Sequence, residues 1–261
     1  MGLEDITHKQ LGGLFVQVLD QAPVVLMAQA AGFDFLFFDG EHGDIDQSRL
    51  SSVMLLGNSL GIPSIVRAPQ LARADVSRML DLGASGVMVP MVETAAQARQ
   101  LVQWAKYPPV GTRSYSGGAH TGYGPSGHHA QNMSRANVAT LAIAQIETVE
   151  GVRNVRDILA VPGLDAAIVG PCDLAISMGR PDEMGCPEEL ALIDEVQAAC
   201  AAAGKGFGII GGNALLARYA GNINLMVSAI DTHILRDALA GAASEYQKIR
   251  AQAKQQPCDR R

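Results

Sequence analysis

The 261-residue chain is poor in several kinds of residue on which particular functions depend. It contains five lysines, one tryptophan and no run of basic residues, and its 26 acidic side chains outnumber the 20 basic ones to give a net charge of −6. Nucleic-acid binding needs clustered positive charge, so this composition argues against a nucleic-acid partner. No apolar run reaches the roughly 18 residues of a membrane span, and the first 13 residues show no signal-peptide pattern. We therefore expect no membrane partner.

Cysteine is also scarce. The chain has four cysteines, which form no C-x-x-C pair and no evident disulfide framework: Cys172, Cys186, Cys200 and Cys258. Cysteines in such a pattern are typical of reduced thiols, and we therefore expect a cytoplasmic protein.

Two kinds of segment alternate along the sequence. Short runs of Val, Ile and Phe are separated by longer stretches of helical periodicity. Because the short runs are apolar on both faces, they predict parallel strands covered by helices. The predicted strands span residues 13–18, 34–39, 63–67, 86–90, 141–147, 166–170, 206–211 and 224–229, and helices are predicted over residues 72–82, 94–104, 151–159, 187–203 and 214–220.

Eight such units predict an α/β fold of the (β/α)₈, or TIM-barrel, type, for which about 250 residues is the usual size. An open doubly wound sheet is the alternative. We expect a single domain over residues 1–253, followed by a frayed polar tail over residues 254–261.

Ionisable residues stand at or just after the ends of four predicted strands. The stretch FDFLFFDGEHGD, for example, changes from bulky apolar residues to three acids and a histidine within a few positions. Chemistry in a barrel takes place at the C-terminal ends of the strands, so we expect these side chains to line one polar pocket. The residues concerned are Asp39, Glu41, His42, Arg67, Glu147 and Asp173.

Glu147 and Asp173 are 26 residues apart, which is about one β/α unit, so adjacent strands would bring both carboxylates to one place. Two buried carboxylates repel each other unless a positive charge lies between them. Oxygen ligands suit a hard divalent cation such as Mg²⁺ or Mn²⁺, with open positions for water or substrate. Taken singly, each carboxylate fits a helix cap better; the pair at matching strand ends favours a metal.

Arg67 and His42 each have two interpretations that the residue types leave open. Arg67 either forms a structural ion pair with a neighbouring strand or supplies a fixed cation to an oxyanion or carboxylate. His42 either forms an oriented acid–base pair with Asp39 or belongs to a helix N-terminus that favours nearby acids. None of the five lysines ends a predicted strand, which argues against aldol chemistry through a lysine Schiff base.

One long segment interrupts the alternation. Residues 107–132 read YPPVGTRSYSGGAHTGYGPSGHHAQN, without helical or strand periodicity, between the fourth and fifth predicted strands. A loop of this length is usually a functional lid or disordered. Loops after strands shape the mouth of a barrel, and Tyr115, His120 and Tyr123 are candidates to line it. A mobile solvent loop is the alternative.

Four motifs together resemble the metal-dependent class II pyruvate aldolases. They are FLFFDGEHGD, IVRAP, GASGVMVPMVETAAQAR and IAQIETVEGVRNVRDILAVPGLDAAIVGPCDLAISMG. That family includes hydroxyoxoheptanedioate aldolase, 2-keto-3-deoxyrhamnonate aldolase and 2-dehydro-3-deoxyglucarate aldolase. The resemblance covers roughly residues 10–240, and QIET followed one strand later by GPCDLAISMG is its most specific part.

The resemblance implies a role for each matching residue. Glu147 and Asp173 would bind a divalent metal, Mg²⁺, Mn²⁺ or Co²⁺, which pyruvate would chelate through its keto and carboxylate oxygens. Arg67 would steady the keto oxygen as it becomes an enolate. His42, oriented by Asp39, would be the acid–base.

The resemblance also implies contacts through the backbone and between subunits. The N–H groups of Cys172 and Asp173 would hold the pyruvate carboxylate, and Asp81 would reach a neighbouring subunit's site. Relatives are commonly hexamers, trimers of dimers, whose last helix packs on a neighbour. Cys172 stands where the family more often has a small apolar residue, and we expect it to be neither metal ligand nor nucleophile. The segment after GTR also departs from the family pattern.

Together these observations predict a carbon–carbon lyase whose partners are small molecules, a 2-oxo acid and an aldehyde. It would cleave or form a 4-hydroxy-2-oxo acid with release or use of pyruvate or hydroxypyruvate. An oxaloacetate decarboxylase using the same enolate site is the alternative. A CoA-thioester lyase would need a longer chain and a basic groove, which we do not find. A barrel that has lost its chemistry is disfavoured because the candidate ligands and Arg67 are all present.

Overall fold

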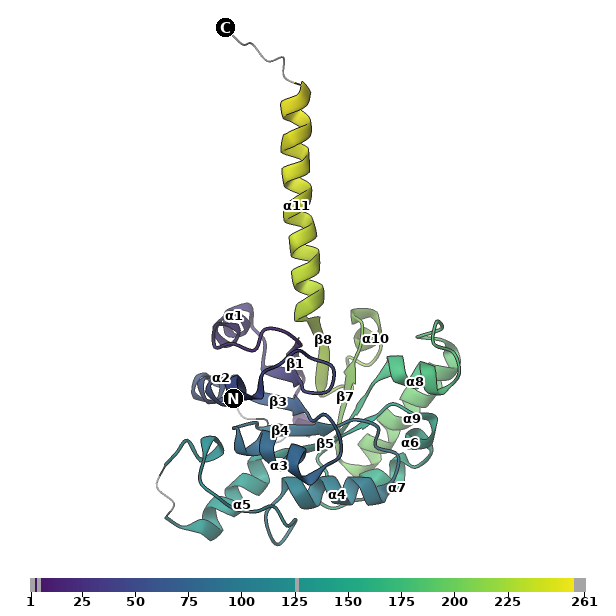
Figure 1. Cartoon of the computed structure of the whole chain (residues 1–261). Coiled ribbons are helices and arrows are strands. Elements are labelled where there is room, and N and C mark those ends of the chain that lie inside the picture. The colour runs from purple at the N-terminus through teal and green to yellow at the C-terminus, as the bar shows by residue number, and fades with distance from the viewer. Residues whose placement is uncertain (1–2, 4–5, 125–126, 256–261) are drawn as a thin grey trace.

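Eight parallel strands close into a barrel in the computed structural model, which describes residues 3, 6–124 and 127–255. Each strand pairs with the next along the chain, and β8 pairs with β1 (Figure 1). The predicted (β/α)₈ barrel is confirmed, and the open sheet is excluded. The strands are β1 (Leu11–Val16), β2 (Phe35–Asp39), β3 (Ser64–Arg67), β4 (Gly86–Val89), β5 (Leu141–Ile146), β6 (Ala166–Val169), β7 (Gly206–Ile210) and β8 (Leu225–Ile230).

Helices follow the strands and cover the outside of the barrel (Figure 1). Every predicted helix is present, although the one predicted over residues 151–159 is divided into two at Asn154. The helices are α1 (Pro23–Ala31), α2 (Gln47–Leu60), α3 (Arg73–Asp81), α4 (Ala95–Ala105), α5 (His129–Ala139), α6 (Val149–Arg153), α7 (Val155–Leu159), α8 (Pro171–Ser177), α9 (Pro187–Ala203), α10 (Asn213–Arg218) and α11 (Asp231–Gln255), with short 3₁₀ turns at Ile6–His8 and Ala119–Thr121.

Local sequence signals set the ends of several helices. Thr94 and Gln97 form a capping box at the start of α4, which satisfies backbone donors that have no partner within the helix. Asp46 caps α2 by accepting a hydrogen bond from the Ser48 N–H. The same helix ends at Leu60 and is followed by Gly61, whose φ of 75° is the left-handed conformation that favours glycine.

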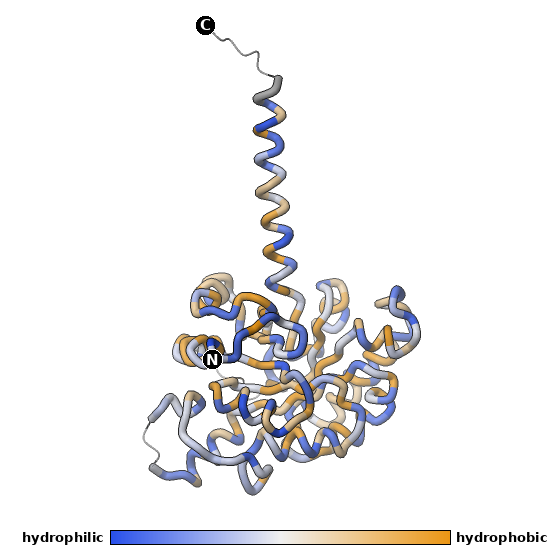
Figure 2. The backbone as a smooth tube through the Cα atoms, in the orientation of Figure 1, coloured by the Kyte–Doolittle hydropathy of each residue, from blue (hydrophilic) through white to orange (hydrophobic). Residues whose placement is uncertain are grey.

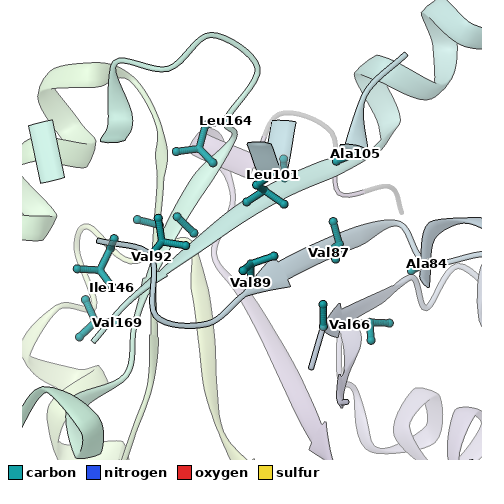
Figure 3. Close-up of a cluster of buried hydrophobic side chains, with 14 of the residues drawn as sticks. Val66, Ala84, Val87, Val89, Val92, Leu101, Ala105, Ile146, Leu164 and Val169 are labelled. Carbon is teal, nitrogen blue, oxygen red and sulfur yellow. The ribbon is translucent and has the colours of Figure 1, made fainter. Parts of the chain in front are cut away.

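The core has two layers. Inside the barrel, alternate side chains of the strands form one apolar cluster, in which the rings of Phe15 and Phe37 stack with their centroids 5.1 Å apart. Outside the barrel, the opposite faces of the strands pack against the helices; Figure 3 shows part of this layer, with Val89 of β4, Ile146 of β5 and Leu101 of α4. Because both faces of each strand are buried, the rigid barrel fixes where each strand ends.

Residues 107–124 and 127–132 lie at the N-terminal end of the barrel, so the prediction that this segment shapes the mouth is wrong. It follows α4, which has already brought the chain back from the mouth, and α5 begins within it. Its contacts are with groups that precede strands: Ala119 lies beside Gly83, and the Tyr107 N–H donates to Asn137 Oδ1 at 2.7 Å. The candidate lining residues Tyr115, His120 and Tyr123 therefore belong to the opposite face from the mouth of their own barrel.

Helix α11 begins against β1 and β8 and then projects away from the barrel (Figure 1). Apolar and polar residues alternate along it (Figure 2), and Leu239, Tyr246 and Ile249 are each more than 60% exposed. Their spacing places them on one face of the helix. The helix continues to Gln255, past the predicted start of the tail; residues 256–261, including Cys258, lie outside the described residues. Within the described part of the chain, no helix combines the length and apolar character that a membrane crossing requires.

Candidate active site

Asp39 and Arg67 meet at the mouth of the barrel, at the ends of β2 and β3, where they are partners in the strand register. The guanidinium donates to Asp39 Oδ1 through Nε at 2.9 Å and lies 2.8 Å from it through Nη2, while Nη1 lies 3.1 Å from Glu41 Oε2. It also lies over the ring of Phe15, 5.6 Å from the centroid. Arg67 therefore forms the ion pair with a neighbouring strand that was one of its two interpretations, and it does so at the barrel mouth.

The carboxylate of Asp39 is fully buried and surrounded by donors. Oδ1 also accepts hydrogen bonds from the backbone N–H groups of Glu41 and His42, both at 3.1 Å, and Oδ2 accepts one from Gln17 Nε2 at 3.1 Å. Burial raises the pKa of Asp39, but Arg67 and these hydrogen bonds outweigh it, so the pKa is lowered from its usual value. Asp39 is thus a fixed anion.

The structure differs from the predicted pairing of His42 with Asp39. Asp39 contacts the backbone N–H of His42, not its imidazole, because the oxygen on that side is already shared with Arg67 and Glu41. The imidazole is 64% exposed, and Glu41 Oε2 lies 3.8 Å from its Nε2. His42 is therefore at the mouth and open to a substrate, and Glu41 is the carboxylate beside its ring.

Glu147 follows β5 and is buried, with 2% of its surface exposed. The N–H of Met91 donates to its Oε1 at 2.8 Å, and the amide of Gln145 donates to its Oε2. The alternative that Glu147 caps the next helix is excluded, because Thr148 is the cap of α6. Burial raises the pKa of Glu147 to about 7; the charges of Asp173 and Glu41 also raise it, while the Met91 N–H and Arg67 lower it.

Asp173 lies in the first turn of α8, directly after β6, and its charge acts on both Glu147 and Glu41. No side-chain hydrogen bond caps α8. Gly170, which precedes the helix, allows the two strand ends to approach closely: a Cβ at this position would lie 2.6 Å from Glu147 Oε2. The mouth therefore combines the carboxylates of Glu147 and Asp173, as their spacing predicted.

The donors at this place fit a divalent cation. The carboxylates of Glu147 and Asp173 lie at this place together with the buried amide of Gln145. The Oε1 of that amide has no hydrogen-bond partner. Burial is the main cause of the raised pKa of Glu147, and a bound cation would offset that cost. Among the residues that the structure describes, no group of three or more His, Cys, Asp or Glu side chains converges in the manner of an all-protein metal cage. Two protein ligands with open positions are consistent with both observations.

Asp81 and Cys172 lie in different surroundings from the pair of carboxylates. Asp81 ends α3, at the opposite end of the barrel from the mouth, and pairs with Arg113 at 2.7 Å. The site of its own chain therefore does not include it. Cys172 lies in the first turn of α8, where backbone N–H groups have no partner within the helix. Its side chain is exposed and borders a cavity of about 720 Å³ with mainly apolar walls, among them Ile210 and Leu215.

Sequence reasoning missed several polar contributors. Glu41 was expected in the pocket, but its contact with Arg67 was not; Gln17 and Gln145 were not singled out, nor was the N–H of Met91. A signal existed for two of them. In a strand, side chains two positions apart point to the same side, which aligns Gln145 with Glu147 and Gln17 with the inward-facing Phe15.

Comparison with known proteins gives a consistent result. Residues 12–214 match the HpcH/HpaI aldolase/citrate lyase family. The chain is 34% identical over 237 residues to a hydroxypyruvate/pyruvate aldolase of Pseudomonas aeruginosa, covering 90% of this chain and 87% of that protein. It is 30% identical to a 2-keto-3-deoxy-L-rhamnonate aldolase of Salmonella paratyphi B, covering 86% and 85%. The crystal structure of an HpcH/HpaI aldolase from Desulfitobacterium hafniense superposes with a TM-score of 0.86 at 28% identity, covering 92% of this chain and 93% of that one.

Proposed function

This chain belongs to the HpcH/HpaI aldolase/citrate lyase family, and we propose that it is a metal-dependent aldolase with pyruvate or hydroxypyruvate as its donor. The reaction is the cleavage or formation of a 4-hydroxy-2-oxo acid, with an aldehyde as the other partner. One observation carries the proposal: four acidic side chains lie at the mouth of the barrel, where Asp39 and Glu41 pair with Arg67 and the charges of Glu41, Glu147 and Asp173 act on one another. Such a surplus of negative charge suits a site that receives a cation.

Glu147 and Asp173 would hold a divalent metal, with Mg²⁺, Mn²⁺ and Co²⁺ as the candidate ions. When bound, such an ion supplies Lewis-acid stabilisation to the oxygen of an enolate. The proposal takes support from the close approach at Gly170, which lets the two carboxylates face the same space. The buried amide of Gln145 donates a hydrogen bond to Glu147 Oε2, and this bond limits the directions in which the carboxylate can turn.

Arg67 would stabilise the negative charge that develops on the keto oxygen. Three of the five N–H groups of a guanidinium are engaged by Asp39 and Glu41, which leaves two for a substrate oxygen. Because the ion pairs hold the guanidinium before the substrate arrives, little reorganisation is needed during the reaction. A fixed cation of this kind favours the enolate over the keto form.

The remaining roles are assigned by position. The imidazole of His42, exposed at the mouth and beside Glu41, would move the proton of the 4-hydroxyl group. The backbone N–H groups of Cys172 and Asp173 lie in the first turn of α8 and would orient the carboxylate of the 2-oxo acid. Neither role requires the thiol of Cys172.

We propose that the active form is a homo-oligomer, a hexamer built as a trimer of dimers. The exposed apolar stripe on α11, formed by Leu239, Tyr246 and Ile249, supports packing on a second copy of the chain. Asp81, placed far from the mouth of its own barrel, would reach a neighbour's site. Mixing inactive Arg67→Ala and Asp81→Asn chains tests this: hetero-oligomers should regain activity, and no recovery after verified exchange of subunits would contradict a role for Asp81 across the interface.

A panel of 4-hydroxy-2-oxo acids tests the proposed function. Pyruvate or hydroxypyruvate released by cleavage is measured with a coupled dehydrogenase, with and without EDTA, and oxaloacetate is included to detect decarboxylation. We expect cleavage of at least one 4-hydroxy-2-oxo acid that stops with EDTA and returns with metal. Turnover of oxaloacetate alone would make the enzyme a decarboxylase instead.

A further inference from the structure

Gln17 is the first residue after β1, and its side chain connects two parts of the molecule. Its Nε2 donates to Asp39 Oδ2 at 3.1 Å, and its Oε1 accepts a hydrogen bond from Thr232 Oγ1 at 3.0 Å. Thr232 lies in the first turn of α11, the helix that projects from the barrel. One amide therefore joins the root of α11 to a buried carboxylate of the candidate site.

The orientation of this amide follows from its partners. An ionised carboxylate only accepts hydrogen bonds, so the NH₂ group of Gln17 must face Asp39. The hydroxyl of Thr232 can then donate to the oxygen on the other side. Asp39 is ionised because the surrounding donors lower its pKa in spite of burial. The amide thus has one arrangement that satisfies both neighbours.

The two oxygens of Asp39 are unequally provided with donors. Oδ1 is bonded to Nε and Nη2 of Arg67 and to two backbone N–H groups, whereas Oδ2 accepts its hydrogen bond from Gln17. A buried carboxylate oxygen that loses its donor bears a desolvation cost that the carboxylate relieves by turning. Turning would move Oδ1 away from Arg67. The position of the guanidinium therefore depends on the donor from Gln17.

The backbone around Gln17 strengthens the connection. Asp231, the first residue of α11, is buried and accepts hydrogen bonds from the N–H groups of Gln17, Val18 and Leu19 at 2.9–3.0 Å. On the other side, the carbonyl of Gln17 accepts a hydrogen bond at 2.8 Å from Asp44, in the loop that carries Glu41 and His42. The start of α11 and the loop after β2 are thus held to one another through the segment that Gln17 begins.

From this geometry we propose that Gln17 is a positioning residue, which acts through Asp39 to hold Arg67 in place and which is itself held by Thr232 at the root of α11. The inference rests on the proposed function, in which Arg67 stabilises the enolate. Gln17 does not touch the reacting atoms. Its loss should lower kcat and leave the KM for pyruvate nearly unchanged, because a misplaced guanidinium mainly affects the charge that develops in the transition state.

Four variants, compared by the rate of pyruvate methyl proton exchange with Mn²⁺ present, test the proposal. Gln17→Leu keeps the bulk of the side chain and removes the donor, and we expect exchange to slow about 10- to 100-fold. Gln17→Glu keeps the shape but replaces the donor by an acceptor, and should be at least as slow. Thr232→Val removes only the hydrogen bond that Thr232 donates to the Gln17 amide oxygen, and we expect the exchange rate to fall about 3- to 5-fold. Gln29→Leu, the same change at an exposed glutamine of α1, is the matched control and should not alter the rate.

The combination Gln17→Leu with Thr232→Val separates positioning from a general loss of stability. Because Thr232 acts through Gln17, the double variant should exchange at the rate of Gln17→Leu alone, within about twofold. Full additivity of the two losses would overturn the proposal, and so would Gln17→Glu at the wild-type rate, which would mean that shape alone matters. If the wild type exchanges the methyl protons and the Gln17 variants exchange them equally fast, only the role of Gln17 is overturned. If the wild type itself shows no exchange, the proposed function on which the inference rests is overturned.

Discussion

The two ends of the barrel both carry buried cations, but they differ in how those cations are matched. At the N-terminal end, Lys106 pairs with Asp165 at 2.9 Å and Arg113 pairs with Asp81 at 2.7 Å, one acid to each base. Lys106 also donates to the carbonyls of Asn137 and Thr140, so its three N–H groups are all used. At the mouth, by contrast, Arg67 pairs with both Asp39 and Glu41, and the charges of Glu147 and Asp173 lie close to Glu41.

The difference separates structural charge from functional charge. A matched, fully bonded pair such as Lys106 with Asp165 holds neighbouring segments together and has nothing left to offer a ligand. The mouth keeps an excess of negative charge and a buried Glu147 whose pKa is raised to about 7 mainly by burial. A folded protein tolerates such an imbalance where a cation or substrate completes the site. Changes at the mouth should therefore alter activity, and changes at the Lys106–Asp165 pair should alter stability.

The largest effect is expected from Arg67→Ala. The variant removes the cation proposed for the enolate and leaves Asp39 buried without its main partner, so both retro-aldol cleavage and pyruvate proton exchange should fall by about 10³-fold. Arg67→Lys, which keeps the charge but not the planar fork, should recover part of the exchange rate. Retention of both activities in Arg67→Ala, measured by NMR and by coupled assay, would remove Arg67 from the mechanism.

A loss of metal affinity is expected from Glu147→Gln and Asp173→Asn. Each removes one negative ligand, so Mn²⁺ binding measured by electron paramagnetic resonance should weaken by more than about 100-fold, and exchange should fall with it. Glu150→Gln is the matched control, since that carboxylate is about half exposed on the next helix and pairs with Arg153. Unchanged Mn²⁺ affinity in both site variants would place the metal elsewhere.

The opposite pattern is expected from Lys106→Met. Loss of this buried cation leaves two carbonyls and the partly buried Asp165 without their partner, which should lower the free energy of unfolding in urea by about 3 kcal/mol, while the folded enzyme keeps its exchange rate within about twofold. Lys248→Met, in an exposed pair with Glu245, should change the unfolding free energy by less than about 1 kcal/mol. A large loss of activity in folded Lys106→Met would remove the distinction between the two ends.

The smallest effect is expected from Cys172→Ala. The proposal uses the backbone N–H of this residue, which alanine retains, and its exposed thiol has no assigned role. Exchange and cleavage rates should therefore stay within about twofold of wild type. A fall of tenfold or more, with normal folding by circular dichroism, would show that the thiol takes part.

The fold and the identity of the main site residues were predictable because both depend on alternation along the chain. Once eight strands of a parallel barrel are recognised, the residues that end them must meet at one face, and Asp39, Arg67, Glu147 and Asp173 do so. The described residues of the segment over 107–132 lie at the other face because α4 returns the chain to the N-terminal end of the barrel before the segment begins.

The partners of individual side chains were less predictable. The sequence places His42 near Asp39, but whether an aspartate binds an imidazole or a backbone N–H depends on the turn that the loop makes. The same holds for the contact of Glu41 with Arg67, which requires the loop after β2 to fold over the end of β3. The hydrogen bond between Gln17 and Thr232 joins residues 215 positions apart, and only closure of the barrel brings them together.

The most direct test of the central claim is the exchange of pyruvate methyl protons in D₂O, followed by NMR, first with EDTA and then with Mg²⁺, Mn²⁺ or Co²⁺ restored. It requires no knowledge of the aldehyde. We predict exchange that vanishes with EDTA and returns with metal, which would establish an enolate-forming, metal-dependent site at the barrel mouth. Absence of exchange with every metal, for pyruvate and then for the C3 protons of hydroxypyruvate, would contradict the claim.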